Sequence, residues 1–178
     1  MTESKADLRY PIGVFEYREP VTAEQRTTWV DTIAATPTKL RAAVAGLNPL
    51  QLETPYRPGG WTVRQVVHHL PDSHLNAYTR CKLALTEDHP TIRPYFEARW
   101  AELPDSARPI EGSLALLDVL HDRWVALLRA IPHEAFGRTC HHPESKIDFT
   151  IDRLVAMYAW HGPHHVAHIT ELRRRQGW

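Results

Sequence analysis

The helical spacing of apolar residues is the feature of this sequence that most constrains its fold. Apolar side chains recur every three or four residues in segments 22–47, 62–87, 113–130 and 151–175, so in each segment they share one face of an α-helix. Alternating patterns typical of β-strands are scarce. Four amphipathic helices in one chain can bury these faces against one another, and the sequence therefore predicts an all-α, antiparallel four-helix bundle.

The helix boundaries are marked by capping residues and by a proline. Thr22 and Thr62 stand at N-cap positions, and Gln65 occupies the capping-box position of the second segment. Pro37 interrupts the first segment, because proline removes a backbone donor and is tolerated best in a first helical turn. Residues 22–47 are therefore predicted to form either one bent helix or two abutting helices.

Connections between the helices are of unequal length. Residues 88–111 are rich in proline and aromatic side chains, and they are predicted to form a long crossing loop folded over the bundle, a candidate lid. Residues 141–150 have a turn-and-extended pattern, and residues 1–20 form an extended N-terminal arm. We expect residues 1–178 to be a single domain, which suits a chain of this length.

The composition excludes several functional classes. Lys plus Arg equals Asp plus Glu at 21 each, so no basic excess indicates a nucleic-acid or anionic membrane partner. No apolar run approaches the roughly 18 residues needed to span a bilayer, and the first residues lack a signal-peptide core. Cys81 and Cys140 are far apart and lack CxxC spacing. We expect a soluble, cytoplasmic protein with buried, reduced thiols.

Histidines are concentrated in two of the helical segments. Seven of the 12 lie in VVHHLPDSH and WHGPHHVAHIT. His161 and His165 are four residues apart, so both can reach one metal ion from the same helix face, and a third imidazole from a facing helix would complete three ligands. Three ligands leave positions open for water or substrate, as in catalytic sites. By spacing alone, His164 with His168 is an equally good pair.

The second helical segment offers His68 or His69 as the third ligand. Helical projection places His69 on one polar face with four other side chains that could orient it or bind substrate. These side chains are Asp72, Ser73, Asn76 and Arg80. Pro71 and Pro163 each remove a backbone donor beside the candidate ligands, which predicts kinks and frees the carbonyls of Val67 and Ala159. A strong distortion at Pro163 would favour the pair His164 and His168.

Two stretches, GGWTVRQVVHHLPDSHLNAYTRCKLALTE and YAWHGPHHVAHITELRRR, resemble the DinB/YfiT-like superfamily, in its branch of metal-dependent hydrolases. The resemblance extends from about Tyr10 to the C-terminus. It implies a four-helix bundle, often a homodimer, that holds one divalent metal ion per chain, zinc or nickel. The ligands that it implies are His69, His161 and His165. Other members of the superfamily are S-transferases that use low-molecular-weight thiols such as bacillithiol or mycothiol.

The sequence accordingly predicts a metal-dependent hydrolase acting on a small-molecule substrate. A thiol S-transferase and a non-enzymatic metal-binding bundle are the alternatives. The HExxH carboxylate of metalloproteases is absent beside the ligands, which argues against peptidase activity. A general base could come from Asp72, His164 or His168, but the sequence assigns no catalytic residue. Arg123 and Trp124 could line the site, although packing is the better interpretation of a tryptophan at core spacing.

Overall fold

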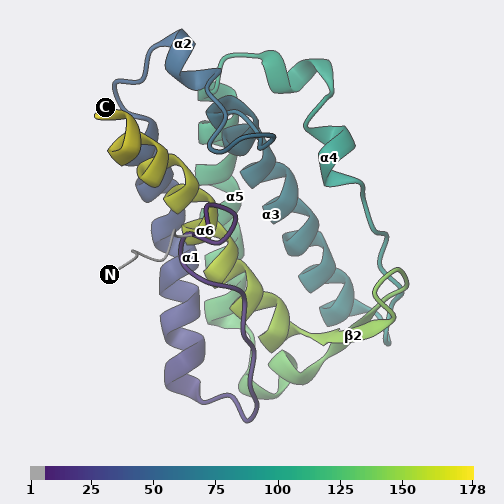
Figure 1. Cartoon of the computed structure of the whole chain (residues 1–178). Helices are drawn as coiled ribbons and strands as arrows, with labels where there is room; N and C mark the ends of the chain where they lie inside the picture. The colour runs from purple at the N-terminus through teal and green to yellow at the C-terminus, as the bar shows by residue number, and fades with distance from the viewer. Residues whose placement is uncertain (1–6) are drawn as a thin grey trace.

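The computed structural model describes residues 7–178, and four long helices form a bundle (Figure 1). They are α1 (Ala23–Val44), α3 (Val63–Thr86), α5 (Glu111–Ala130) and α6 (Ile151–Gln176). The shorter elements are α2 (Pro49–Leu52), α4 (Glu97–Trp100), the 3-10 turns η1 (Pro104–Ala107) and η2 (His133–Gly137), and a hairpin of β1 (Thr139–His142) and β2 (Ile147–Thr150). The predicted four-helix bundle is confirmed.

Helices α1, α3 and α6 begin where threonine caps them. Thr22 and Thr62 accept hydrogen bonds from the amides of Gln25 and Gln65, whose side chains accept in return from the cap amides, so both are capping boxes. Thr150 caps α6 in the same sense by accepting from the Arg153 amide. Each cap satisfies backbone donors that the first helical turn leaves without partners.

Pro37 lies inside one continuous helix. Helix α1 runs without a break from Ala23 to Val44, so the structure selects the single-helix alternative over two abutting helices. The side chain of Pro37 is buried among the core residues of α1, and its ring is compatible with helical backbone angles. Because Pro37 has no amide donor, the carbonyl of Ile33, one turn earlier, lacks its helical hydrogen-bond partner.

The helix directions follow from contacts near the helix ends. Arg26 pairs with Asp152 at the starts of α1 and α6, and Arg173 donates to the Ala43 carbonyl at their ends, so these helices run parallel. Helix α3 runs opposite to α6 and parallel to α5, while α5 runs opposite to α1 (Figure 1). The antiparallel arrangement therefore holds for the pairs α1 with α5 and α3 with α6.

A parallel pair of consecutive helices requires a connection as long as the bundle, and the segment between α3 and α5 provides it. This is the predicted crossing loop, which carries α4 and η1 along one side of the molecule (Figure 1). Its first part pairs with the hairpin, since Ile92 donates its amide to the His141 carbonyl and His141 donates to the Pro90 carbonyl. The turn-and-extended segment after α5 is thus a short β-hairpin.

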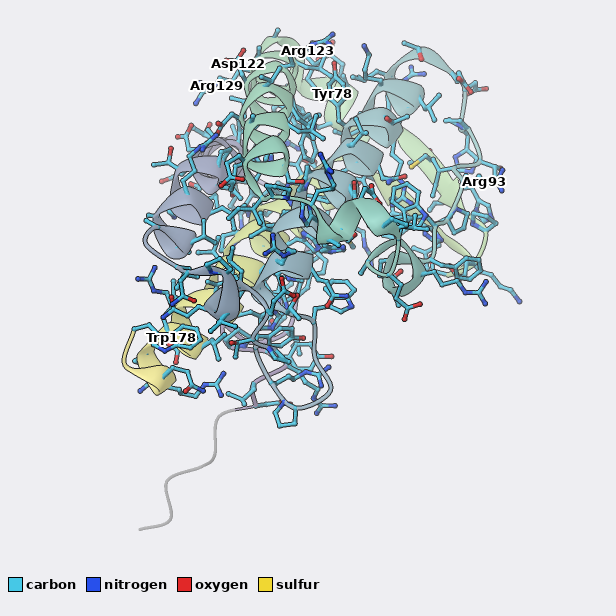
Figure 2. All side chains as sticks on the ribbon, turned by 90° about the horizontal axis from the view of Figure 1, so that it is seen from above. Tyr78, Arg93, Asp122, Arg123, Arg129 and Trp178 are labelled. Carbon is cyan, nitrogen blue, oxygen red and sulfur yellow. The ribbon has the colours of Figure 1, made fainter. Side chains whose placement is uncertain are left out.

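The core fills the space between the four helices. Trp124 is completely buried, which confirms packing as its role, whereas Arg123 lies on the outside, with its guanidinium 5.9 Å from the centroid of the Tyr78 ring (Figure 2). Cys81 and Cys140 are buried free thiols, as expected. Within residues 7–178, no helix combines the length and apolar character needed to cross a membrane.

The N-terminal arm lies against α6. Its described part, residues 7–20, is irregular, and residues 1–6 of the predicted arm lie outside the described residues. Trp160 donates its indole N–H to the Gly13 carbonyl, and His168 Nε2 lies 3.2 Å from the Arg9 carbonyl oxygen. These contacts bring the arm to the same region of α6 as the histidine cluster.

Candidate metal centre

Two antiparallel helices bring three histidines together. His69 of α3 faces His161 and His165 of α6, and one ring nitrogen of each lies within 4.8 Å of the others. The Nε2 atoms of His69 and His161 are 3.3 Å apart, and the rings of His161 and His165 have centroids 4.5 Å apart. The helical spacing of four residues survives Pro163, because α6 is continuous through it.

The distances fit a shared metal ion. Two nitrogens that each lie 2.0–2.1 Å from a tetrahedral metal are about 3.3–3.4 Å apart, which the His69 and His161 Nε2 atoms match at 3.3 Å. The Nδ1 atom of His165 is buried and has no hydrogen-bond partner among the described residues. Within residues 7–178 the Nδ1 atoms of His164 and His168 are also without partners, so it is the grouping of one nitrogen each from His69, His161 and His165 within 4.8 Å that suits a divalent ion.

Burial keeps these imidazoles neutral. It lowers the pKa of His69 to about 4, and it is the largest cause of pKa values well below 6.5 for His161 and His165, to which the neighbouring imidazoles add. A neutral imidazole has a free lone pair, which is the form that binds a metal ion. The three side chains are therefore ready to act as ligands at neutral pH.

Trp61 holds two of these rings in position. Its ring lies 4.6 Å from that of His69 and stacks on that of His165 at 6.2 Å, measured between centroids. Trp61 immediately precedes the Thr62 cap, so the start of α3 fixes its location. The same residue thereby links the beginning of α3 to the ligand-bearing turn of α6.

The cluster opens into a cavity of about 580 Å³. Its walls combine aromatic side chains with two guanidinium groups near the rim, Arg9 and Arg57, and one carboxylate, Glu97. Tyr95 and Glu97 belong to the crossing loop, which therefore forms one wall beside the histidines. The remaining lining residues include Tyr10, Tyr56, Trp61, Ser73, Met157 and Tyr158.

Residues 32–169 match the family model of the DinB superfamily. The chain belongs to the DinB superfamily. A Bacillus cereus protein named "Putative metal-dependent hydrolase" is 54% identical over 172 residues, which cover 97% of this chain and 99% of that protein. A Bacillus thuringiensis protein of the same description is equally similar over the same length.

A solved structure shares the fold of this DinB-superfamily chain. YfiT from Bacillus subtilis, described as "a probable metal-dependent hydrolase with an unusual four-helix bundle topology", superposes with a TM-score of 0.94 at 52% identity. The match covers 96% of this chain and 98% of YfiT. The parallel pairing of α1 with α6 and of α3 with α5 is the topology that this chain shows.

The other candidate histidines occupy different positions. His68 faces α5, where its ring nitrogens lie 2.7 Å from Ser113 Oγ and 3.0 Å from the Arg108 carbonyl oxygen. His164 and His168 line the cavity beside the three candidate ligands, and His168 stacks on Tyr56 with centroids 3.9 Å apart. Of the alternatives that spacing left open, His69 rather than His68 faces α6.

The polar face of α3 contributes less to the site of this DinB-superfamily chain than its pattern predicts. Ser73 lines the cavity and lies 3.2 Å from the Tyr158 hydroxyl. Asp72, Asn76 and Arg80 do not line it: Asn76 donates to the Asp72 carbonyl, and Arg80 donates to the Arg93 carbonyl in the crossing loop. Within the described residues none of these three side chains has a hydrogen bond to His69, and their role in orienting it or binding substrate stays a prediction.

Two histidines that sequence reasoning left without a role adjoin the site. His74 Nε2 is 3.1 Å from His161 Nδ1, and His121 Nε2 is 2.8 Å from His74 Nδ1. The signal for His121 was present in the sequence, because it occupies a core position between Leu117 and Trp124 in the apolar stripe of α5. An imidazole at such a position must find hydrogen-bond partners inside the protein.

A second group of ligand-type side chains lies on the hairpin. His141 Nδ1 is 2.8 Å from Asp148 Oδ1, and His89 Nε2 is 3.5 Å from the same oxygen. These residues are far more exposed than the cluster in the bundle, and each histidine is already hydrogen-bonded through Nδ1, His89 to Thr139. The buried cluster is therefore the metal centre that the geometry favours.

Gly162, next to His161, allows α1 and α6 to approach closely. A Cβ atom at this position would lie 2.6 Å from Thr36 Cγ2 and 2.7 Å from Thr36 Oγ1. We expect Gly162→Ala to destabilise the protein by about 1–3 kcal/mol through overpacking, although alanine has the higher helix propensity. Urea unfolding measures the change. Thr36→Ala in the same chain should restore part of the loss, and stabilisation by Gly162→Ala alone would contradict the close contact.

Proposed function

We propose that this chain is a metal-dependent hydrolase of a small-molecule substrate, with one divalent ion, zinc or nickel, held by His69, His161 and His165. The observation that carries the proposal is the convergence of three neutral imidazoles, two of them buried and that of His161 half-buried, in the wall of an open cavity. The names of the relatives from Bacillus agree with it. A divalent ion supplies Lewis acidity and lowers the pKa of water at its open positions.

The remaining side chains of the cavity bind and orient the substrate. Trp61 and Tyr95 provide apolar surface, while Arg57 attracts anionic groups; the other guanidinium group of the wall, that of Arg9, is paired with Asp7. Glu97 is the only carboxylate among the cavity-lining residues of the described chain, and it is exposed. Of the general bases that the sequence suggested, Asp72 lies outside the cavity, whereas His164 and His168 line it, so Glu97, His164 and His168 are the groups placed to accept a proton.

Transfer of a low-molecular-weight thiol is the second candidate function. Arg57 in the cavity wall favours it, because a thiol such as bacillithiol carries carboxylates that Arg57 would bind while the sulfur reaches the metal. The two reactions are separated by turnover of an ester and of an electrophilic substrate, each with and without added thiol. Hydrolysis proceeds without thiol, whereas transfer requires it.

A purely structural metal is the third reading, and the ligand count argues against it. Within residues 7–178, no fourth histidine, cysteine or carboxylate joins the three-histidine group. A closed structural site has four protein ligands, and its removal unfolds the domain. We therefore expect chelation to leave a folded, inactive protein with unchanged helical circular dichroism. Unfolding on chelation at neutral pH would instead support a structural metal.

Metal content tests the ligand set directly. We expect about one zinc or nickel per chain in the native protein, and loss of the metal in His69→Ala, His161→Ala and His165→Ala, because each variant leaves only two imidazoles. Elemental analysis after dialysis against metal-replete buffer gives the stoichiometry. His68→Ala is the matched control, since His68 is equally buried at 7% exposure and bonds elsewhere. Metal retained in a ligand variant would remove that residue from the set.

A further inference from the structure

A helix carbonyl in the bundle core lacks its ordinary partner. In an α-helix the carbonyl of residue 33 accepts from the amide of residue 37, but that residue is Pro37, which has no N–H. The His121 ring of α5 takes its place, with Nδ1 2.7 Å from the Ile33 carbonyl oxygen. Pro71 and Pro163 also free carbonyls, yet within the described residues only the one freed by Pro37 has a side-chain partner.

From this carbonyl a chain of imidazoles crosses the bundle. His121 Nε2 lies 2.8 Å from His74 Nδ1, and His74 Nε2 lies 3.1 Å from His161 Nδ1. The chain thus passes from α1 to α5, then to α3 and finally to α6, through three neighbouring helix pairs (Figure 1). His74 is fully buried and His121 is 2% exposed, so water does not compete for these bonds.

The direction of every hydrogen bond follows from the first one. A carbonyl oxygen can only accept, so His121 Nδ1 carries the proton and, in a neutral ring, His121 Nε2 accepts. His74 must then donate from Nδ1 and accept at Nε2. His161 in turn donates from Nδ1, which leaves its Nε2 without a proton. This Nε2 is the atom that faces His69 at 3.3 Å.

We propose that the Ile33 carbonyl, freed by Pro37, fixes the tautomer and orientation of His161 through His121 and His74, so that His161 Nε2 presents its lone pair to the metal. This inference rests on the proposed role of His161 as a ligand. His74 and His121 are then positioning residues rather than catalytic ones. They act as outer partners of a ligating imidazole, except that two further imidazoles replace the usual carboxylate or carbonyl.

Zinc affinity tests the chain of hydrogen bonds. Loss of an outer partner typically weakens metal binding 10–100-fold, and we expect His121→Leu to do so in competition titrations against a chromophoric chelator. His121→Gln should retain most of the affinity, because its amide can donate to the Ile33 carbonyl and accept from His74. Trp124→Phe is the control for a disturbed core, since Trp124 packs on both rings without joining the chain. Equal affinities of the leucine variant and the native protein would overturn the proposal.

Ring nitrogen NMR tests the tautomer without any metal. In metal-free protein labelled with ¹⁵N-histidine, His161 should show a protonated Nδ1 and an unprotonated Nε2, and His121→Leu should produce a mixture of tautomers. A His161 ring protonated at Nε2 in the native protein would contradict the inference. Because this readout needs no zinc, a protein that fails to bind metal but shows the expected tautomer would refute the proposed function alone.

Pro37→Ala separates positioning from stability. The new amide at residue 37 would compete for the Ile33 carbonyl and draw it back into the helix. We expect zinc affinity to fall several-fold while the melting temperature does not fall, since proline is the poorest residue inside a helix. A simple structural role predicts changes of the same sign in both measurements. Undiminished zinc affinity together with a native His161 tautomer would exclude the carbonyl as the anchor.

Discussion

Metal-free protein is expected to lose most of its stability as the pH falls from 6.5 towards 4. Burial lowers the pKa of His69 and of His121 from 6.5 to about 4, although the Ile33 carbonyl and the charge of Asp118 raise that of His121. Between these values the unfolded chain binds protons that the folded protein excludes. The free energy of unfolding therefore falls with the pH, and the contribution is fully present only above pH 6.5.

The size of the pKa shifts indicates whether protonation can unfold the metal-free protein. A pKa lowered from 6.5 to about 4 corresponds to about 3 kcal/mol for a single buried group such as His121. Domains of this size are stable by about 5–15 kcal/mol, so a few such groups suffice to unfold the chain. Burial also lowers the pKa values of five further histidines near the site. These are His74, His161, His164, His165 and His168.

One carboxyl group acts in the opposite direction. Burial raises the pKa of Asp72 to about 6, so the folded protein gains a proton there before the unfolded chain does, and this favours folding in acid. Asp72 is a single, partly exposed group, whereas the histidines are many and mostly buried. The histidines therefore dominate.

The pH dependence of the unfolding free energy is measured by urea unfolding of chelator-treated protein at about pH 7.0, 6.0, 5.0 and 4.5. These values roughly span the interval between the two protonation states. The slope of the unfolding free energy against pH gives the number of protons taken up, and His121→Gln should reduce it by about one proton. A free energy that stays constant from neutral pH to about pH 5 would mean that these histidines remain neutral in the unfolded chain or charged in the folded one.

The fold was predictable because its determinants are local. Threonine caps and the spacing of apolar residues mark the helices, and the long segment before α5 indicates a crossing connection. Helix directions were less accessible, since a pattern of apolar faces suits parallel and antiparallel neighbours alike. The continuity of α1 through Pro37 depends on tertiary packing, which outweighs the cost of one lost hydrogen bond.

The site was predictable only in part, and for a different reason. Spacing narrowed the ligands on α6 to two pairs, and the family resemblance selected His161 with His165, which the structure places opposite His69. The partners His74 and His121 were missed because hydrogen bonds between three helices depend on the bundle geometry rather than on any sequence spacing. The four-residue offset between Ile33 and Pro37 was visible, but the donor that uses the freed carbonyl was not.

Replacing Arg26 by methionine is expected to destabilise the protein by about 3–5 kcal/mol, because it leaves a buried carboxylate without its partner. Arg26 Nε lies 2.6 Å from Asp152 Oδ1 and Arg26 Nη2 lies 2.7 Å from Asp152 Oδ2, a two-pronged pair whose side chains are only 12% and 9% exposed. Arg26 also lies over the Phe136 ring, with the guanidinium carbon 5.2 Å from its centroid.

The position of the ion pair explains why its loss should lower the stability of the protein. Asp152 lies in the first turn of α6, where a carboxylate interacts favourably with the helix dipole, and Arg26 lies in the first turns of α1. The pair thereby joins the starts of two parallel helices, whose dipoles do not attract one another. Hydrophobic packing between α1 and α6 offsets the repulsion between their parallel dipoles along their length, and the ion pair of Arg26 with Asp152 offsets it at the starts of the two helices.

A comparison of variants separates burial of the charge from the ion pair itself. Denaturant unfolding of Arg26→Met, Asp152→Leu and the double variant gives the coupling energy, and the double variant should recover much of the loss, since apolar replacement of a buried pair is often close to neutral. Arg41→Ala is the matched control. Its pair with Asp118 joins α1 to α5 on the surface, at 46% and 41% exposure, and should contribute less than about 1 kcal/mol. Similar losses for Arg26→Met and Arg41→Ala would show that burial does not set the strength of these pairs.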